Sequence, residues 1–79
     1  MSGKRIIDER PLDFLSKAKF KNVLIELKNG EKYRGVLQSF DIHINIVLKD
    51  AEQMVNGEVK RRLGTTFFRG DTIILISFK

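Results

Sequence analysis

Residues 22–40 read NVLIELKNGEKYRGVLQSF, and this stretch decides the fold class. Every second residue from Val23 to Leu27 is apolar, which is typical of a half-buried strand. Asn29-Gly30 follows, the dipeptide most typical of a two-residue hairpin turn. The returning strand is predicted over Tyr33–Phe40, where the internal Gly35 indicates a sharp bend. Bends of this kind let a short sheet close into a small barrel.

The rest of the chain continues as short strands separated by turn residues. We predict three further strands, at Ile44–Lys49, Val59–Phe68 and Thr72–Phe78. The segments between the strands carry turn residues, at Asp41-Ile42-His43, Asn56-Gly57 and Arg69-Gly70-Asp71. A glycine inside the fourth strand, Gly64, indicates a second bend.

One short helix is predicted before the sheet, over Pro11–Lys19. Pro11 suits the first helical position, and the apolar residues after it recur at helical spacing. Residues 1–9 are expected to form a flexible tail, which leaves residues 10–79 as one domain. The predicted fold class is mostly β: a short N-terminal helix followed by a strongly bent, five-stranded antiparallel small barrel.

Length and composition limit how such a barrel can be stabilised. The chain has 79 residues, no Cys and one His, so neither disulfides nor a zinc site can supplement a small core. Oligomerisation is then the remaining source of buried surface. No apolar run is long enough to span a membrane, and the N-terminus does not resemble a signal peptide. We therefore expect a soluble, cytoplasmic protein.

The last predicted strand is apolar on both faces, whereas a small barrel has one interior. Ile74 and Ile76 alternate with Ile73 and Leu75, so one of these pairs should face away from the core. A terminal strand is also expected at a sheet edge, where unpaired backbone groups can accept another chain. An aggregation-prone edge is one interpretation and a subunit interface is the other. The lack of other stabilisers favours the interface.

Charge and motifs exclude most enzyme classes. The formal net charge of +5 fits binding of a phosphate backbone, and it fits a surface adapted for solubility equally well. His43 is the only side chain that ordinarily titrates near neutrality, and its nearest acid, Asp41, lies two residues away in a turn. No glycine-rich loop joins a strand to a helix. We expect no catalytic activity, no cofactor and no metal.

Two groups of residues resemble the motifs of the Sm-like (Lsm) family. Asn29-Gly30, Gly35 and residues 40–45 (FDIHIN) resemble the first Sm motif, which ends in Asp, any residue, an aromatic or His, an apolar residue and Asn. Residues 68–76 (FRGDTIILI) resemble the second motif, and residues 10–13 (RPLD) resemble the helix start of archaeal members. The resemblance extends over nearly the whole chain.

This resemblance implies a ring-forming protein that binds U-rich single-stranded RNA around a central pore, as a scaffold or chaperone in RNA processing. In archaeal members the ring usually has seven identical subunits, and the fourth strand of one subunit pairs with the fifth strand of the next. The implied interface consists of apolar residues on these strands: Phe67, Phe68, Ile73, Ile74, Leu75 and Ile76.

Two other functions remain as alternatives at this stage. One is an SH3-like module that binds proteins without RNA specificity, which would need an aromatic groove although the chain has one Tyr and no Trp. The other is a monomeric OB-like single-strand binder.

The implied RNA-binding residues are His43, Asn45, Arg69, Gly70 and Asp71. His43 and Arg69 are flat groups expected to stack on the two faces of a base. Asn45 is expected to recognise the uracil edge with its amide. Gly70 is expected to provide the backbone freedom of a tight turn, and the resemblance implies that the backbone near this turn also approaches the base.

The orientation of the Asn45 amide must be fixed, because one orientation suits uracil and the reverse suits cytosine. We expect Asp71, whose carboxylate is only an acceptor, to fix it. Asp41 is expected either to brace its own turn or to pair with Arg69. A secondary RNA contact is implied at Arg10 and Phe40.

Overall fold

The computed structural model describes residues 10–79, so the predicted tail at residues 1–9 lies outside the described part. Helix α1 (Pro11–Ala18) begins at the predicted proline and ends one residue before the predicted end. Its first turn is closed by Asp13, whose carboxylate accepts a hydrogen bond of 3.4 Å from the Arg10 backbone N–H. No helix among residues 10–79 is long and apolar enough to cross a membrane.

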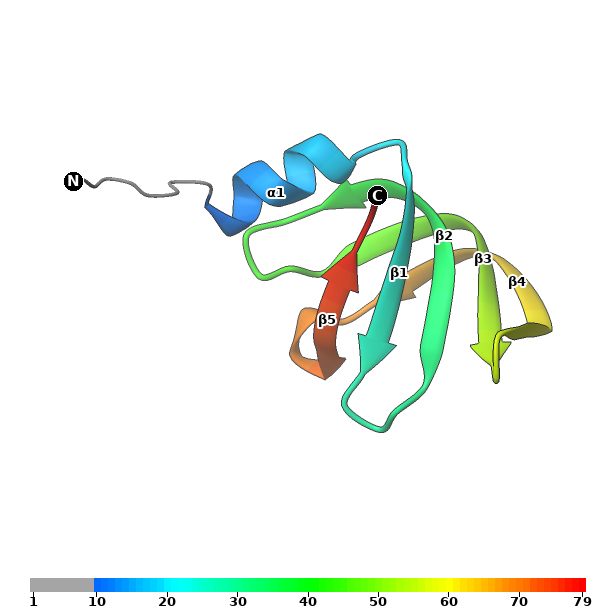
Figure 1. The fold of residues 1–79 in the computed structure, drawn as a ribbon. Coiled ribbons are helices and arrows are strands. Elements are labelled where there is room, and N and C mark those ends of the chain that lie inside the picture. Colours follow the sequence, from blue (N-terminus) through cyan, green and yellow to red (C-terminus); the bar gives the residue numbers. More distant parts are fainter. Residues whose placement is uncertain (1–9) are drawn as a thin grey trace.

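Five antiparallel strands follow the helix and form one sheet (Figure 1). They are β1 (Asn22–Leu27), β2 (Lys32–Phe40), β3 (Ile46–Val55), β4 (Glu58–Phe68) and β5 (Ile73–Ser77). The strand order is β4-β3-β2-β1-β5, and a 3₁₀ turn, η2 (Gly70–Thr72), leads from β4 into β5. The predicted fold class is confirmed, and so are both hairpins.

The third strand differs most from its prediction. It was expected over Ile44–Lys49, but β3 begins two residues later and continues to Val55. The late start has a local cause, because the backbone N–H of Asn45 donates to the Asp41 carboxylate. The unpredicted part pairs with β2 on one side and β4 on the other, although its residues alternate less clearly between apolar and polar.

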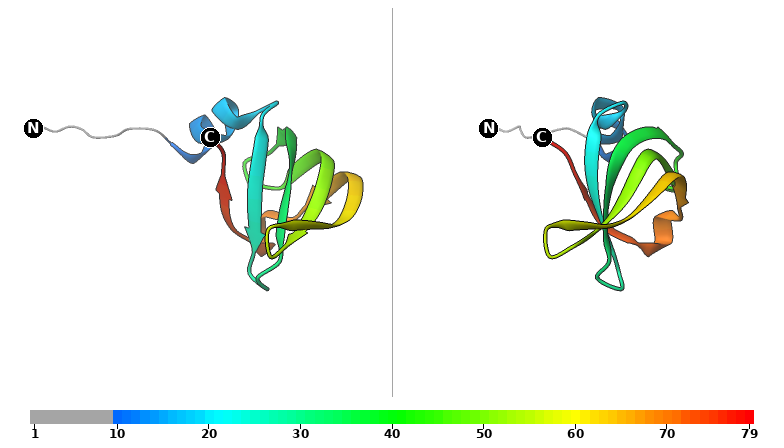
Figure 2. Two further views of the ribbon diagram at one scale, coloured as in Figure 1. Left: turned by 45° about the vertical axis from the view of Figure 1, so that its right-hand side comes forward. Right: turned by 90° about the vertical axis from the view of Figure 1, so that its right-hand side faces the viewer.

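Both predicted bends coincide with irregularities of strand pairing. The β2–β3 register shifts between Arg34 and Val36, on either side of Gly35. Gly64 has a φ of +74° and lies opposite Ala51, where the β3–β4 register also shifts. Glycine adopts this φ without steric cost, whereas other residues rarely do. The bent strands wrap round one interior, and α1 lies across one end of it (Figure 2).

The core is a single cluster that draws on α1 and on strands β1 to β4. Its largest fully buried side chains are Ile25, Leu37, Ile46 and Leu48. Helix α1 contributes residues one turn apart on one face, so its predicted apolar stripe packs on the open end of the barrel. Its buried members are Leu15 and Ala18.

The sheet has two free edges. Within residues 10–79, no hydrogen-bonded pairing joins β4 to β5, so each has one side without a partner strand. Leu75 is aligned with Glu26 and Ile73 with Leu27, which makes Ile74 an extra, bulged residue in β5. The expectation that side chains of β5 alternate strictly between the core and the outside is therefore wrong. Ile73 and Ile76 pack against the core, whereas Ile74 and Leu75 are exposed.

Candidate nucleic-acid interface

The loop between β2 and β3 is held by one side chain, Asp41. One carboxylate oxygen accepts from the backbone N–H groups of His43 and Asn45, at 2.9 and 3.1 Å. The other oxygen accepts from the Asn45 side-chain nitrogen, Nδ2, at 3.1 Å. Of the two expectations for Asp41, bracing its own turn is the one the structure bears out.

These hydrogen bonds also change the acidity of the carboxyl group. They lower the pKa of Asp41 below its ordinary value, and the bond from the Asn45 side chain is the largest cause. Desolvation is the second-largest cause and raises the pKa, whereas the backbone bonds and the nearby His43 ring lower it further. Asp41 is therefore ionised, and an acceptor only, at neutral pH.

The loop contains an unusual backbone conformation at Ile44, whose φ is +63°. A β-branched residue is strained there, at a cost of about 1–3 kcal/mol. The Ile44 side chain packs against the core, which offsets part of this cost. The reversal at Ile44 separates the exposed His43 from Asn45, which is half-buried and directed toward the turn before β5.

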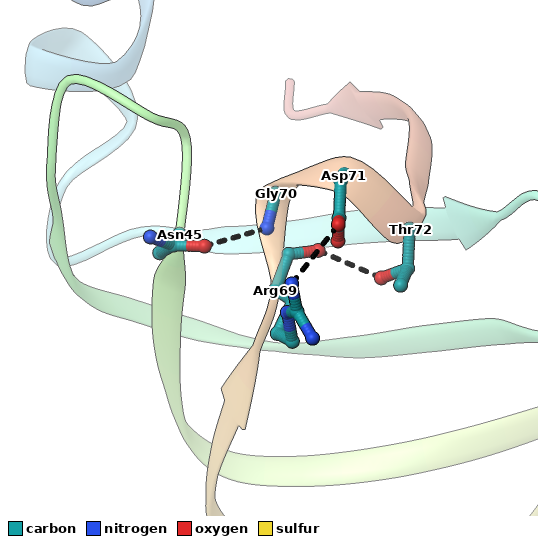
Figure 3. A network of polar contacts seen from close by, with 5 residues as sticks. All are labelled: Asn45, Arg69, Gly70, Asp71 and Thr72. Atoms are coloured by element: carbon teal, nitrogen blue, oxygen red, sulfur yellow. Dashed lines mark hydrogen bonds and ion pairs between the residues drawn. The ribbon is translucent and has the colours of Figure 1, made fainter.

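The turn between β4 and β5 forms the other half of the site (Figure 3). The Arg69 guanidinium donates to the Asp71 carboxylate at 3.1 Å, and the Thr72 hydroxyl donates to the Arg69 carbonyl at 2.7 Å. The expectation that Asp71 fixes the Asn45 amide is wrong. Asp41 and the backbone of Gly70 hold that amide, because Gly70 N–H donates to Asn45 Oδ1 at 2.8 Å.

Gly70 is required by close approach rather than by an unusual φ. A Cβ at this position would overlap the His43 carbonyl oxygen and lie 2.8 Å from the Ile44 carbonyl carbon. The φ of Gly70 is not positive, so the predicted need for conformational freedom was wrong. The missing side chain lets the turn lie directly against the β2–β3 loop.

These loops, the start of α1 and strand β5 enclose a cleft of about 870 Å³. All five predicted RNA-binding residues line it: His43, Asn45, Arg69, Gly70 and Asp71. Arg10 and Phe40 are not among the lining residues, so the implied secondary contact is separate from the cleft. The rest of the lining is apolar and includes Phe14, Ile74 and Leu75.

The six predicted interface residues fall into three groups. Phe67 on β4 and Ile74 on β5 are the most exposed, at 60% and 61%, followed by Leu75 at 43%. Ile73 and Ile76 are partly buried within the subunit. Phe68 is 6% exposed and packs edge-on against Tyr33, so it belongs to the subunit core rather than to a free surface.

Sequence reasoning missed the orienting role of Asp41 and the hydroxyl of Thr72. A signal for Asp41 existed, because Asp before a turn commonly accepts hydrogen bonds from the backbone N–H groups that follow it. Thr72 gave no comparable signal, since its bond depends on the 3₁₀ geometry of η2.

The fold and the paired loops define a small barrel with two Sm-type motifs, and comparisons with known proteins agree. The LSM domain family matches residues 13–78. An snRNP Sm-like protein of Archaeoglobus fulgidus is 47% identical over 68 residues, which cover 86% of this chain and 88% of the relative. The chain belongs to the LSM family.

Solved structures give the same result. A Sm protein of Pyrococcus abyssi in complex with a uridine heptamer is 48% identical, with a TM-score of 0.84 over 87% of this chain and 97% of that one. A heptameric archaeal Sm protein is 39% identical, with a TM-score of 0.76 over 81% of this chain and 93% of that one.

The close approach of Gly70 gives a first prediction. Gly70→Ala should displace the β2–β3 loop and break the bond to Asn45, at a cost of about 1–3 kcal/mol in stability. NMR resonances of the Asn45 side-chain amide should shift together with a lower melting temperature. Gly57→Ala is the control: its φ is +81° with open space around the Cβ, so it tests backbone strain alone. Unchanged Asn45 resonances in Gly70→Ala would contradict the assignment.

The lowered pKa of Asp41 gives a second prediction. Its ionised form stabilises the loop above the ordinary carboxyl pKa of 3.8, and this contribution is lost as pH falls through the lower folded-state pKa. The NMR chemical shifts of the His43 backbone amide and the Asn45 side-chain amide should therefore change together as Asp41 is protonated, with a midpoint below pH 3.8. Asp41→Asn should abolish the common transition. Separate midpoints, or one above 3.8, would refute the bracing role.

Proposed function

We propose that this protein binds U-rich single-stranded RNA as a homo-oligomeric ring, with one nucleotide per subunit around a central pore. It would act as a scaffold or chaperone in RNA processing, not as an enzyme. The observation that carries the proposal is the Asn45 amide, which is held in one orientation by two independent partners. It lines a cleft together with the exposed, flat side chains of His43 and Arg69.

The fixed amide suits uracil. One Asn45 N–H is bound to Asp41 and one side of its carbonyl oxygen accepts from Gly70, so one N–H and one lone pair remain available. Uracil offers O4 as an acceptor and N3–H as a donor, which match this pair. Cytosine offers the reverse pattern and would meet donor with donor and acceptor with acceptor.

Stacking would supply most of the affinity of each pocket. His43 and Arg69 are both exposed and line the same cleft, on separate loops. An imidazole and a guanidinium can each cover one face of a base, and such stacking contributes about 1–3 kcal/mol per base. The ion pair with Asp71 restrains the Arg69 guanidinium without neutralising the site, because both side chains are mostly exposed.

The free edges support the ring. Strand β4 carries the exposed Phe67, and β5 carries the exposed Ile74 and Leu75, so the two edges differ and can pair head to tail. Such contacts close into rings when the rotation between subunits allows it. The relative with 39% identity is heptameric, and the relative with 48% identity was solved with a uridine heptamer. A ring would link weak pockets through effective concentration.

An SH3-like protein-binding module is less well supported. The one Tyr, Tyr33, is 7% exposed, and its hydroxyl donates to Glu31, so it cannot line an aromatic groove. The secondary RNA contact stays a prediction: Arg10 is exposed at the start of α1, and Phe40 is only partly buried. A cytoplasmic location also stays a prediction.

Native mass spectrometry tests the assembly and the RNA together. The wild-type protein should give one species near seven times the 9.1 kDa chain, and this species should take up oligo-uridine. Leu75→Asp and Ile74→Asp place a charge at the free edge of β5 and should give smaller species. Val55→Asp is the matched control, because Val55 is 42% exposed against 43% for Leu75 but lies in β3, an inner strand that is paired on both sides. A wild-type monomer, or full rings from both edge variants, would contradict the ring.

Base preference tests the pocket separately. Asp41→Asn keeps an acceptor for the loop backbone but removes one of the two partners that hold the Asn45 amide. The reversed amide orientation then becomes less costly, so the preference for oligo-U over oligo-C should narrow by about fivefold or more. Competition binding at one salt concentration measures this ratio. Among residues 10–79, Asp71 pairs with Arg69 and forms no hydrogen bond with Asn45, so Asp71→Asn should leave the ratio unchanged. Equal effects of the two variants would show that Asp41 does not select the base.

A further inference from the structure

Phe20, in the connection between α1 and β1, combines two costly features. Its φ is +69°, in the left-handed region that favours glycine, and its side chain is 66% exposed. An exposed aromatic ring gains little from burial, so the fold itself does not offset the strain. Non-glycine residues in such conformations tend to lie at functional sites.

The backbone around Phe20 is fixed independently of its side chain. Phe20 N–H donates to the Leu37 carbonyl at 2.7 Å, and Leu37 N–H donates to the Lys21 carbonyl at 3.0 Å. Lys21 N–H also donates to the Ala18 carbonyl at 2.9 Å. These bonds continue the sheet up to the helix, and a glycine at residue 20 would keep all of them.

Two lysines flank Phe20 in the chain, and each lies near an aromatic ring. Lys19 Nζ lies 5.1 Å from the centre of the Phe20 ring, and Lys21 Nζ lies 5.3 Å from the centre of the Phe78 ring. Within residues 10–79 neither lysine forms an ion pair with a carboxylate. Lys21 also lines a groove of about 660 Å³ whose described lining has no Asp or Glu. This groove includes Arg34, whose charge is already paired with Glu52.

We propose that Lys19, Phe20 and Lys21 form a cationic aromatic surface that binds a single-stranded RNA base and its flanking phosphates, as a second site distinct from the Asn45 pocket. The ring supplies a stacking plane and the lysines supply phosphate contacts, which is the combination that single-strand binders use. An acidic peptide would be attracted by the lysines but would make no comparable use of the ring.

The cationic aromatic surface lies apart from the Asn45 pocket and should differ from it in base selectivity. The pocket cleft is lined by Pro11, Phe14 and Leu15 of α1, whereas the cationic aromatic surface follows the last residue of the helix, Ala18. At that end the chain turns from α1 into β1 (Figure 1). Helix α1 has eight residues and is roughly 12 Å long, and the surface lies beyond its last residue. Phe has no polar group and Lys only donates, so the surface should accept any base. It would hold RNA beyond the nucleotides seated in the pockets.

Phe20→Gly is the decisive variant, because binding and stability should change in opposite directions. Relief of the positive φ should raise the melting temperature, whereas loss of stacking should weaken binding of a 15-nucleotide oligo-adenosine by about fivefold or more. Binding of a seven-nucleotide oligo-uridine should stay unchanged. Phe20→Trp should restore oligo-adenosine binding, because it restores a stacking plane.

Asn56→Gly is the matched control, since Asn56 also has a positive φ, of +53°, in the β3–β4 turn. It should leave oligo-adenosine binding unchanged. Unchanged oligo-adenosine binding in Phe20→Gly would overturn the proposal. If Phe20→Gly weakened binding of poly-glutamate as much as binding of oligo-adenosine, the proposal would also be overturned, because this would indicate an acidic protein partner. Failure of the Asn45 pocket would appear instead as weak oligo-uridine binding by the wild-type protein.

Discussion

The hydrogen bond from Gly70 N–H to Asn45 Oδ1 holds the site together, because it joins two loops that are 25 residues apart in the chain. It forms only if the turn before β5 lies directly on the β2–β3 loop, which the missing side chain of Gly70 permits. It also requires Asn45 to point at the turn, which the reversed backbone at Ile44 and the Asp41 carboxylate bring about. The orientation of the Asn45 amide thus depends on the whole contact between the β2–β3 loop and the turn before β5, which we call the junction.

The same junction links the site to the free edge of the sheet. The 3₁₀ turn that presents Gly70 runs directly into β5, where the bulge at Ile74 turns two neighbouring apolar side chains outward. The cleft therefore has a polar end at the loops and an apolar end at the edge. A partner strand that covers the apolar end would leave the polar end open. Assembly and base recognition would then share one rigid element, so the position of each pocket in a ring would follow from the pairing of its own β5.

The sequence predicted the fold closely but the site only in outline. Alternation and the two Asn-Gly turns located the strands, because burial and turn geometry act on neighbouring residues. The five RNA-binding candidates came together in one cleft as the resemblance implied. What failed depended on contacts between distant residues or on irregular backbone. The residue that orients Asn45 is Asp41 and not the expected Asp71. The bulge at Ile74 breaks the expected alternation, and the glycine at position 70 is required by steric approach.

The non-glycine residues with positive φ differ in whether other interactions offset the cost of their backbone conformation. Asn56 tolerates this conformation through its own side chain, and Ile44 gains from packing against the core. Phe20 has neither compensation, since its ring is mostly exposed and its backbone bonds do not need the side chain. Residues in strained conformations of this kind tend to lie at functional sites. The chain is basic and lysines precede and follow Phe20 in the sequence, so the partner that would use both the ring and the charge is a nucleic acid strand.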